Sequence, residues 1–170
     1  VCDKFTGERI GEADLASDDQ VAAAVAAARS SFETVRLEPY DRYRILHRAS
    51  TLIEDRRDGF VRTIVAEAGF PIADAANEVS RAVQTFMISA EEAKRLTGEV
   101  VPIDGAPGQA HRMAFSIRVP RGVVCAITSF NSPLNMVAHK VAPALASGNT
   151  VVLKVPQSTP LTAALLLHAP

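Results

Sequence analysis

Cysteine is scarce in this sequence of 170 residues, and tryptophan is absent. The two cysteines, Cys2 and Cys125, lie far apart, so no disulfide framework is expected. The chain opens without a positively charged and then apolar leader, and no export signal is therefore predicted. Together these features favour a reducing, cytoplasmic setting.

A surplus of charge of either sign is also missing. The sequence has 18 Lys and Arg against 19 Asp and Glu, which gives a formal net charge of −1, and it has no long basic run. Affinity for nucleic acids rests mostly on clustered Lys and Arg side chains that meet phosphates. A nucleic acid is therefore not expected as a partner.

Long hydrophobic runs are lacking too. The most apolar stretches are interrupted by His139, Lys140 and Lys154, and none reaches the roughly 18 to 20 residues that a bilayer-spanning helix needs. The sequence therefore predicts no membrane partner, and no metal site is predicted either. With 48% hydrophobic and 22% charged residues, it has the composition of a globular domain or of part of one.

The two ends of the sequence lack the usual signs of a complete protein. The chain opens directly on the polar turn Thr6-Gly7-Glu8. At the other end, the apolar helix predicted from Leu161 runs to Pro170 without a glycine or a basic C-cap. We therefore expect the sequence to be a fragment of a longer protein.

Helical spacing dominates the first three quarters of the chain. Ser17 and Asp18 offer N-cap oxygens to an Ala-rich helix, and Gly69 marks the end of a later helix. Four helices are expected, namely residues 21–32, a segment opened by Pro39, residues 58–68 and residues 73–96. The charges of the second segment fall mostly outside its apolar stripe and are interpreted as a solvated face.

Beyond residue 99 the pattern becomes that of strands. Residues 100–103 and 113–119 flank the turn-rich stretch 104–108 and predict a strand, a loop and a second strand. Residues 122–128 form a continuous apolar run, which is typical of a strand buried on both faces of a parallel sheet.

An alternation of helix and strand completes the chain. A helix opened by Pro133 and closed by Gly148 precedes a strand over residues 150–154, and a last helix begins at Pro160. Strand, helix, strand and helix form the repeating unit of a doubly wound fold. The predicted fold class is α/β, with a helical N-terminal segment that leads into a doubly wound, Rossmann-like parallel sheet.

The loops after the last two strands are the expected ligand sites. Ligands of open parallel sheets bind beyond the carboxyl ends of the strands, which selects residues 128–133 and 154–160. Each loop leads to the start of a helix, where free backbone N–H groups and the helix dipole favour the negative atoms of a nucleotide. The motifs G-x-G-x-x-G and G-x-x-x-x-G-K-[ST] are nevertheless both missing.

Cys125 is the one internal cysteine and hence a tempting nucleophile. It stands in the middle of an apolar strand, where a thiol is expected to be buried and unreactive. We therefore do not assign it a catalytic role.

A series of short motifs runs through nearly the whole chain. The motifs are Thr6-Gly7-Glu8, Arg44-Ile45-Leu46, Glu67-Ala68-Gly69, Glu78-Val79, Gly98-Glu99, Pro120-Arg121-Gly122-Val123-Val124, Phe130-Asn131-Ser132-Pro133 and the run from Ala142 to Lys154. In type and order they resemble the N-terminal half of the aldehyde dehydrogenase superfamily. The resemblance implies that the family's nucleophilic cysteine and general-base glutamate lie downstream of this chain.

The resemblance implies catalytic roles for Asn131 and Lys140. Asn131 is similar to the family's oxyanion-hole asparagine, whose side-chain N–H would hydrogen-bond the substrate oxygen as that oxygen gains negative charge. Its spacing alone would favour a cap of the following helix or of its turn, and the resemblance reverses this preference. Lys140 matches a family lysine close to the active site, where a cation could orient a water or a proton path. Without the resemblance, Lys140 and His139 would be ordinary surface or interface residues.

The resemblance also implies which residues bind the cofactor, NAD or NADP. Lys154 matches a lysine that hydrogen-bonds the adenosine ribose hydroxyls, and Gln157 stands where many NAD-preferring members have a glutamate that accepts both hydroxyls. The residues implied in a cofactor-facing segment are Thr128, Ser129 and Phe130. The simpler alternatives are a solvated strand end for Lys154, a core position for Phe130 and a polar turn for Gln157.

Two serines depart from the family pattern. The family commonly has a proline at the position of Ser129 and a bulky residue at the position of Ser132. The shape of the substrate site near Ser132 is therefore left open.

Taken as a whole, the resemblance implies the N-terminal portion of an NAD(P)-dependent aldehyde dehydrogenase, which oxidises an aldehyde to a carboxylate through a cysteine thiohemiacetal. It divides the chain into a helical part of the cofactor-binding domain (residues 1–99), projecting oligomerisation strands (100–120) and the incomplete start of a Rossmann-like core (121–170). A homo-oligomer, dimer or tetramer, is implied. The alternative is a nucleotide-binding or structural α/β module without catalysis, which a downstream G-Q-x-C segment would exclude.

Overall fold

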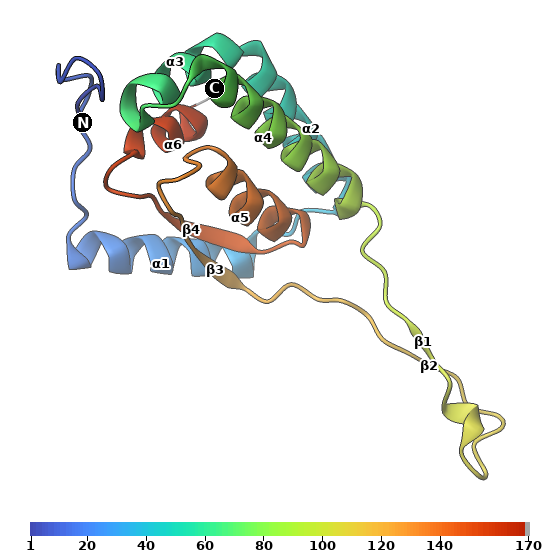
Figure 1. Cartoon of the computed structure of the whole chain (residues 1–170). Coiled ribbons are helices and arrows are strands. Elements are labelled where there is room, and N and C mark those ends of the chain that lie inside the picture. The colour runs from blue at the N-terminus through green and yellow to red at the C-terminus, as the bar shows by residue number, and fades with distance from the viewer. Residues whose placement is uncertain (169–170) are drawn as a thin grey trace.

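The computed structural model describes residues 1–168 and contains a helical part, a small parallel sheet and a projecting arm (Figure 1). The helices are α1 (Asp18–Thr34), α2 (Pro39–Asp55), α3 (Arg57–Ala68), α4 (Ile72–Ala93), α5 (Asn135–Ala146) and α6 (Pro160–Leu167). The strands are β1 (Val100–Val101), β2 (Ala114–Phe115), β3 (Val123–Ile127) and β4 (Thr150–Lys154). Within the described residues, no helix is both long and apolar enough to cross a membrane.

The expected order of elements is confirmed, with shifts at their ends. Ser17 caps α1 in a reciprocal capping box with Gln20, and Gly69 ends α3 in the left-handed conformation. The fourth helix ends at Ala93, earlier than its apolar pattern predicts, because Leu96 is exposed and no packing holds it in the helix. The predicted end of the last helix at Pro170 lies outside the described residues.

Strands β3 and β4 form a parallel pair joined by α5. Their register runs from Val123 opposite Thr150 to Ile127 opposite Lys154. A parallel pair needs a crossover connection, which α5 provides, so the β-α-β unit predicted from the sequence is confirmed.

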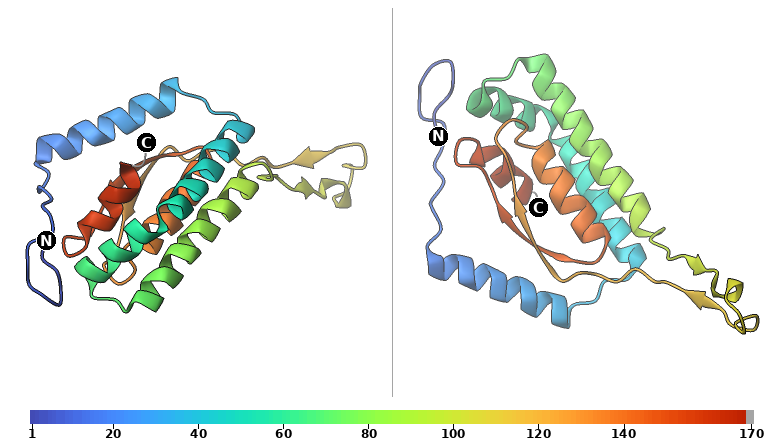
Figure 2. Two further views of the ribbon diagram at one scale, coloured as in Figure 1. Left: turned by 90° about the horizontal axis from the view of Figure 1, so that it is seen from above. Right: turned by 60° about the horizontal axis from the view of Figure 1, so that its bottom comes forward.

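The elements stack in layers around this pair. Helix α1 lies along one face of the sheet and α5 along the other, with α4 packed on the far side of α5 and α2 against α4 (Figure 2). The threonine hydroxyl of Thr150 donates to the carbonyl of Ala28 at 2.9 Å and ties β4 to α1.

The apolar core lies between the helices rather than on the sheet. Leu46 of α2, Phe60 and Ile64 of α3, Val79 of α4 and Leu134 before α5 are all almost fully buried in one cluster. Burying apolar area is the main favourable term in folding, so the four helices α2 to α5 provide most of the stability of the chain.

The prediction that residues 122–128 are buried on both faces is wrong. Ala126 and Thr128 are buried on the side of α5, whereas Cys125 is exposed and Ile127 is 63% exposed on the opposite side. Successive side chains of a strand point to opposite faces, and α1 covers its face only in part. The expectation of a buried Cys125 falls with it, and its thiol is accessible in this chain.

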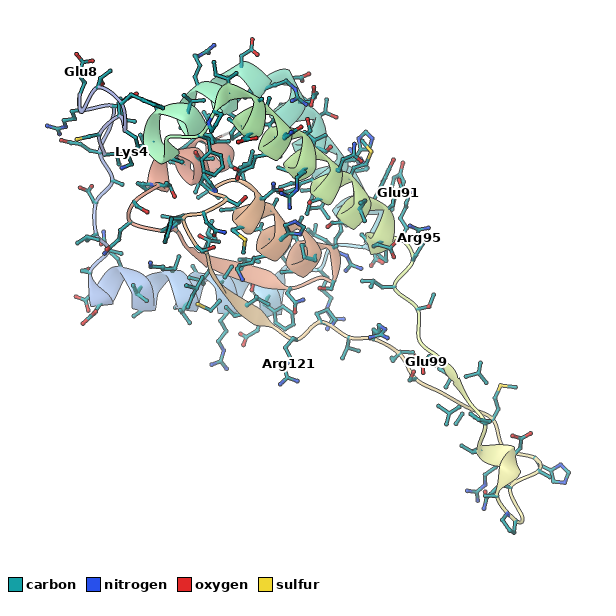
Figure 3. All side chains as sticks on the ribbon, viewed as in Figure 1. Lys4, Glu8, Glu91, Arg95, Glu99 and Arg121 are labelled. Carbon is teal, nitrogen blue, oxygen red and sulfur yellow. The ribbon has the colours of Figure 1, made fainter. Side chains whose placement is uncertain are left out.

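The arm consists of residues 97–121 and projects away from the body (Figure 1). Its antiparallel strands pair only over Val100–Phe115 and Val101–Ala114, fewer residues than expected, because a 3-10 turn at Ile103–Gly105 bends the chain out of the ladder. At the base of the arm, a Cβ on Gly98 would collide with the carbonyl of Ser116, so this close crossing requires glycine. In Figure 3, Arg95 lies just after the end of α4, where the first arm segment leaves the body, Glu99 lies farther out along that segment, and Arg121 lies where the second segment returns.

Two buried glutamates connect the helical part to the β-α-β unit. Glu78 of α4 accepts the backbone N–H groups of Leu134 and Asn135 at 2.8 and 3.1 Å with one carboxylate oxygen, Oε1. Its other oxygen, Oε2, has no hydrogen-bond partner among the described residues. Asn135 returns a bond from Nδ2 to the backbone carbonyl of Glu78 at 3.3 Å.

Glu67, at the end of α3, uses both of its oxygens. Oε2 accepts from the backbone N–H of Leu161 at 2.8 Å, and Oε1 accepts from the backbone N–H of Thr162 at 2.8 Å and from the Thr162 hydroxyl. The first N–H groups of a helix have no partner within the helix and attract negative charge. Glu67 and Glu78 therefore cap α6 and α5 from another part of the chain.

The two caps predict unequal responses to removal of the charge. In Glu67→Gln an amide NH₂ must face a backbone N–H, and we expect a loss of about 1.5–3 kcal/mol in the free energy of unfolding. In Glu78→Gln the amide oxygen can keep both N–H bonds while the NH₂ replaces the unpartnered oxygen, so only the charge–dipole term is lost, about 1 kcal/mol or less. Urea unfolding of this chain measures both values.

Glu99→Gln provides the matched control, because Glu99 is exposed on the arm. It is expected to change the free energy of unfolding by less than about 0.5 kcal/mol. Equal losses in Glu67→Gln and Glu78→Gln, or a larger loss in the latter, would contradict the assigned geometry.

Candidate functional site

The two predicted ligand loops leave the sheet at the same edge. Thr128 follows β3, and both its backbone N–H and its hydroxyl donate to the carbonyl of Lys154, at 3.1 and 3.2 Å. Ile127 is the register partner of Lys154. The loops after β3 and β4 therefore start side by side at the carboxyl edge of the parallel pair, where ligands of such sheets bind.

The helix starts behind these loops do not offer free N–H groups, contrary to expectation. Glu78 occupies the N–H groups of Leu134 and Asn135 before and at the start of α5, and Glu67 occupies those of Leu161 and Thr162 in α6. A helix N-terminus attracts a negative group, and here a protein carboxylate occupies the place that a nucleotide phosphate would take. Ligand recognition at this edge must therefore use the side chains or the backbone groups of the loops rather than these four N–H groups at the helix starts.

Asn131 is exposed in the loop between β3 and α5. Its Oδ1 accepts a hydrogen bond from the Ser129 hydroxyl at 2.7 Å. The N–H groups at the start of α5 are taken by Glu78, so the alternative reading of Asn131 as the cap of this helix does not hold. Within residues 1–168, no protein group accepts from its Nδ2, so this amide can donate to a ligand.

The aromatic neighbour of Asn131 faces solvent. Phe130 is 64% exposed, so the alternative that it belongs to the core is wrong. Thr128, by contrast, is buried, and its hydroxyl is used by the carbonyl of Lys154. Of the three residues implied in a cofactor-facing segment, Ser129 and Phe130 therefore present their side chains, whereas Thr128 acts within the fold.

Lys154 and Gln157 are both exposed at the end of β4 and in the loop after it. The five ion pairs found among residues 1–168 include neither Lys154 nor Lys140. Lys140 is half-buried and follows the exposed His139. Both residues belong to α5, whereas the other candidates belong to the loops or to the end of β4. The structure thus gathers the loop candidates at one edge, with Lys140 on the helix that follows the first loop.

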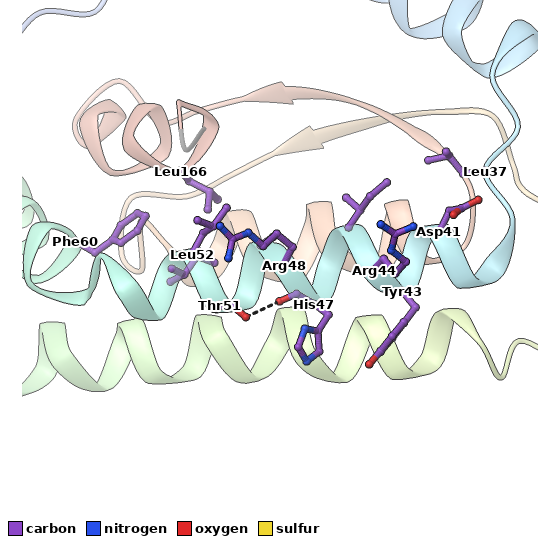
Figure 4. A pocket seen from close by; sticks show the side chains of 13 residues that line it. Leu37, Asp41, Tyr43, Arg44, His47, Arg48, Thr51, Leu52, Phe60 and Leu166 are labelled. Atoms are coloured by element: carbon purple, nitrogen blue, oxygen red, sulfur yellow. Dashed lines mark hydrogen bonds between the residues drawn. The ribbon is translucent and has the colours of Figure 1, made fainter.

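Two hollows of the described residues lie away from the candidate residues. One hollow of about 890 Å³ follows α2 and is lined by side chains such as Tyr43, His47 and Leu166 (Figure 4). A second, of about 830 Å³, lies between the ends of α1 and α5 and the start of α2. Neither is lined by any of the seven predicted site residues.

The titrating groups with shifted pKa lie elsewhere. The hydrogen bond from Arg57 lowers the pKa of the Glu54 carboxyl and raises that of the Arg57 guanidinium, at the junction of α2 and α3. Backbone N–H groups of Thr6 and Phe5 lower the pKa of Asp3. The side chains of the loops at the sheet edge carry amide, ammonium and hydroxyl donors. Such groups stabilise negative charge and bind polar ligand atoms, and they do not attack a substrate.

Asn149 is a positioning residue whose contacts the sequence does not reveal. Its Oδ1 accepts the backbone N–H groups of Arg121 and Gly122 at 2.6 and 2.9 Å, and its Nδ2 donates to the carbonyl of Ala144 and the hydroxyl of Ser147. It thereby joins the start of β3 to the end of α5. The sequence does not reveal the capping roles of Glu67 and Glu78 either, although both residues belong to family motifs. An acidic residue among the apolar positions of a helix is the one sequence signal that points to such a role.

Comparison with known proteins gives one consistent result. The sequence profile described as "Aldehyde dehydrogenase family" matches residues 1–169. A 3-sulfolactaldehyde dehydrogenase from Priestia aryabhattai is 46% identical over 163 residues, which cover 96% of this chain and 34% of that protein. The chain thus spans about a third of the length of the curated relatives it matches.

Solved structures agree with the sequence comparison. Glyceraldehyde-3-phosphate dehydrogenase GapN from Methanocaldococcus jannaschii, complexed with NADP, matches with a TM-score of 0.90 and 34% identity, covering 98% of this chain and 35% of that one. An NAD-dependent benzaldehyde dehydrogenase from Corynebacterium glutamicum matches with a TM-score of 0.86 and 32% identity, covering 97% and 35%.

Proposed function

The chain belongs to the aldehyde dehydrogenase family, and we propose that it is the N-terminal portion of an NAD(P)-dependent enzyme that oxidises an aldehyde to a carboxylate. The observation that carries the proposal is the placement of two donor-bearing loops, with Asn131 in one and Lys154 and Gln157 in the other, at one edge of a parallel sheet. A cytoplasmic location is part of the proposal.

The chemistry divides between this chain and the rest of the protein. A cysteine outside the chain attacks the aldehyde carbon to form a thiohemiacetal, and loss of a hydride from that carbon leaves a thioester. Water then releases the carboxylate from the thioester. The nicotinamide cofactor supplies the acceptor for the hydride that leaves the substrate carbon. The residues present here bind, orient and stabilise, in keeping with a loop set that is rich in hydrogen-bond donors.

Asn131 is proposed as the oxyanion donor. When the cysteine adds to the carbonyl, the aldehyde oxygen gains negative charge, and an N–H already aimed at it lowers the barrier without reorganisation. The available Nδ2 of Asn131 supports this role. Lys140 is proposed to orient a water or a proton path from its half-buried position on α5.

The oxyanion role predicts a rate effect without a binding effect. In the complete enzyme, Asn131→Ala should slow the single-turnover chemical step by about 100- to 1000-fold, or about 2.7–4 kcal/mol, because one preorganised donor is lost. Cofactor affinity should change little. Asn77→Ala, the same change at an exposed position of α4, provides the control. A single-turnover rate of Asn131→Ala within about threefold of wild type would exclude the role.

Lys154 and Gln157 are proposed to hold the adenosine ribose of the cofactor, together with the loop that contains Thr128, Ser129 and Phe130. Both side chains fit this group, because an exposed ammonium has three donors and an exposed amide has an acceptor for a hydroxyl. A glutamate at position 157 would repel the 2′-phosphate of NADP, whereas glutamine does not. We therefore propose that the complete enzyme accepts NADP as well as NAD, with discrimination of about tenfold in either direction.

Gln157→Glu in the complete enzyme tests this assignment. The added carboxylate should lower kcat/KM for NADP relative to NAD by a factor corresponding to about 1–4 kcal/mol, depending on solvent exposure. Gln84→Glu makes the same change on an exposed position of α4 and should leave the ratio unaltered. An unaltered ratio in Gln157→Glu, or a native enzyme that rejects NADP by more than about a thousandfold, would show the assignment to be wrong.

Residues 100–120 of the arm are proposed to provide oligomerisation strands, with residues 1–99 as the helical part of the cofactor-binding domain and residues 121–170 as the start of its core. Several apolar side chains of the arm are exposed, namely Val100, Met113, Phe115, Ile117 and Val119. Exposed apolar patches of this kind mark interaction surfaces. A homo-oligomer, dimer or tetramer, is proposed for the complete protein.

The division of the chemistry predicts that this chain has no turnover of its own. With NAD or NADP and a panel of aldehydes, the 170-residue chain should reduce no cofactor above background, because the proposed nucleophile and general base lie outside it. Cys125 is exposed and needs its own control. Aldehyde-dependent reduction that disappears in Cys125→Ser would overturn this division.

A further inference from the structure

Among the described residues, the Ser129 hydroxyl forms the one side-chain hydrogen bond found for Asn131. Ser129 Oγ donates to Asn131 Oδ1 at 2.7 Å, across a single intervening residue in the loop after β3. We propose that Ser129 is a positioning residue, which fixes the amide of Asn131 with Nδ2 toward the oxygen of the bound aldehyde. This inference rests on the proposed function of Asn131.

The need for such a contact follows from the symmetry of an amide. The two ends of an asparagine side chain have nearly the same shape, and rotation about its last bond exchanges a donor for an acceptor. If Oδ1 faced the developing oxyanion, two negative oxygens would meet and the transition state would be opposed rather than stabilised. A donor held against Oδ1 therefore selects the productive orientation.

Among residues 1–168, no other hydrogen bond to the Asn131 side chain selects this orientation. Asn131 is exposed, and the backbone N–H groups at the start of α5, which could otherwise have bound its oxygen, are taken by Glu78. Donation from a hydroxyl to Oδ1 also polarises the amide and strengthens its N–H as a donor.

The decisive experiment uses the complete enzyme and four single variants. Ser129→Ala removes the hydroxyl, and Ser129→Thr keeps it. Asn131→Ala removes the whole amide, whereas Asn131→Asp keeps an oxygen for Ser129 and removes the N–H. The readouts are the single-turnover rate of cofactor reduction and, separately, the dissociation constant of the cofactor.

A hydrogen bond between neutral groups predicts a moderate effect on the chemical step. With the cofactor saturating, so that any part of Ser129 in cofactor binding does not enter the rate, Ser129→Ala should slow single-turnover reduction by about 3- to 10-fold. Ser129→Thr should stay within about twofold of the wild-type rate. In an Asn131→Ala background, Ser129→Ala should have no further effect, because its partner is already gone.

Asn131→Asp and Asn131→Ala together test the orientation itself. If Nδ2 faces the substrate, both variants should be much slower than wild type, and Asn131→Asp should be at least as slow as Asn131→Ala, because a carboxylate oxygen replaces the donor. If Oδ1 faces the substrate instead, the wild-type amide already opposes the developing charge, so Asn131→Ala should be no slower than wild type, and the inference is overturned.

The other outcomes separate this inference from the proposed function. An active wild-type enzyme in which Ser129→Ala keeps its rate, or loses equally in the Asn131→Ala background, overturns the positioning role alone. A complete protein that oxidises no aldehyde overturns the proposed function, and the positioning role with it.

Discussion

Two buried carboxylates hold the α/β part of this chain against its helices. Glu67 and Glu78 are 0% and 3% exposed, and each accepts backbone N–H groups at the start of a helix more than fifty residues later in the chain. A buried charge is tolerated only where it is hydrogen-bonded, and an uncapped helix start is tolerated only where its N–H groups find acceptors. The carboxylate gains hydrogen-bond donors and the helix start gains an acceptor, so the helical part and the β-α-β part of the chain stabilise each other.

The candidate site depends on these contacts. The loop that contains Asn131 runs from the end of β3, where Thr128 bonds to the carbonyl of Lys154, to Leu134, whose N–H is held by Glu78. Both ends of the loop are thus fixed to elements that pack in the core. Donors placed on such a framework lose little freedom when they meet a ligand, which is the condition for electrostatic stabilisation of a transition state.

The sequence predicts the order of elements because local signals and apolar spacing dominate there. The Ser17 cap, the Gly69 terminus and the alternation of strand and helix after residue 121 each have a local cause. The exposure of Cys125 and Ile127 could not be read in the same way, because burial depends on which layers cover a face. The resemblance located Asn131, but only the structure shows that Ser129 holds its amide and that Glu78 occupies the helix start behind it.

The central claim is that the donors at this sheet edge serve aldehyde oxidation with a nicotinamide cofactor. The most direct measurement is the stoichiometry of the reaction in the complete protein, with carboxylate formed and NAD or NADP reduced measured together after aldehyde is added. The account predicts one carboxylate for each cofactor reduced. A complete protein that binds the cofactor but reduces none of it when aldehydes are supplied would contradict the account.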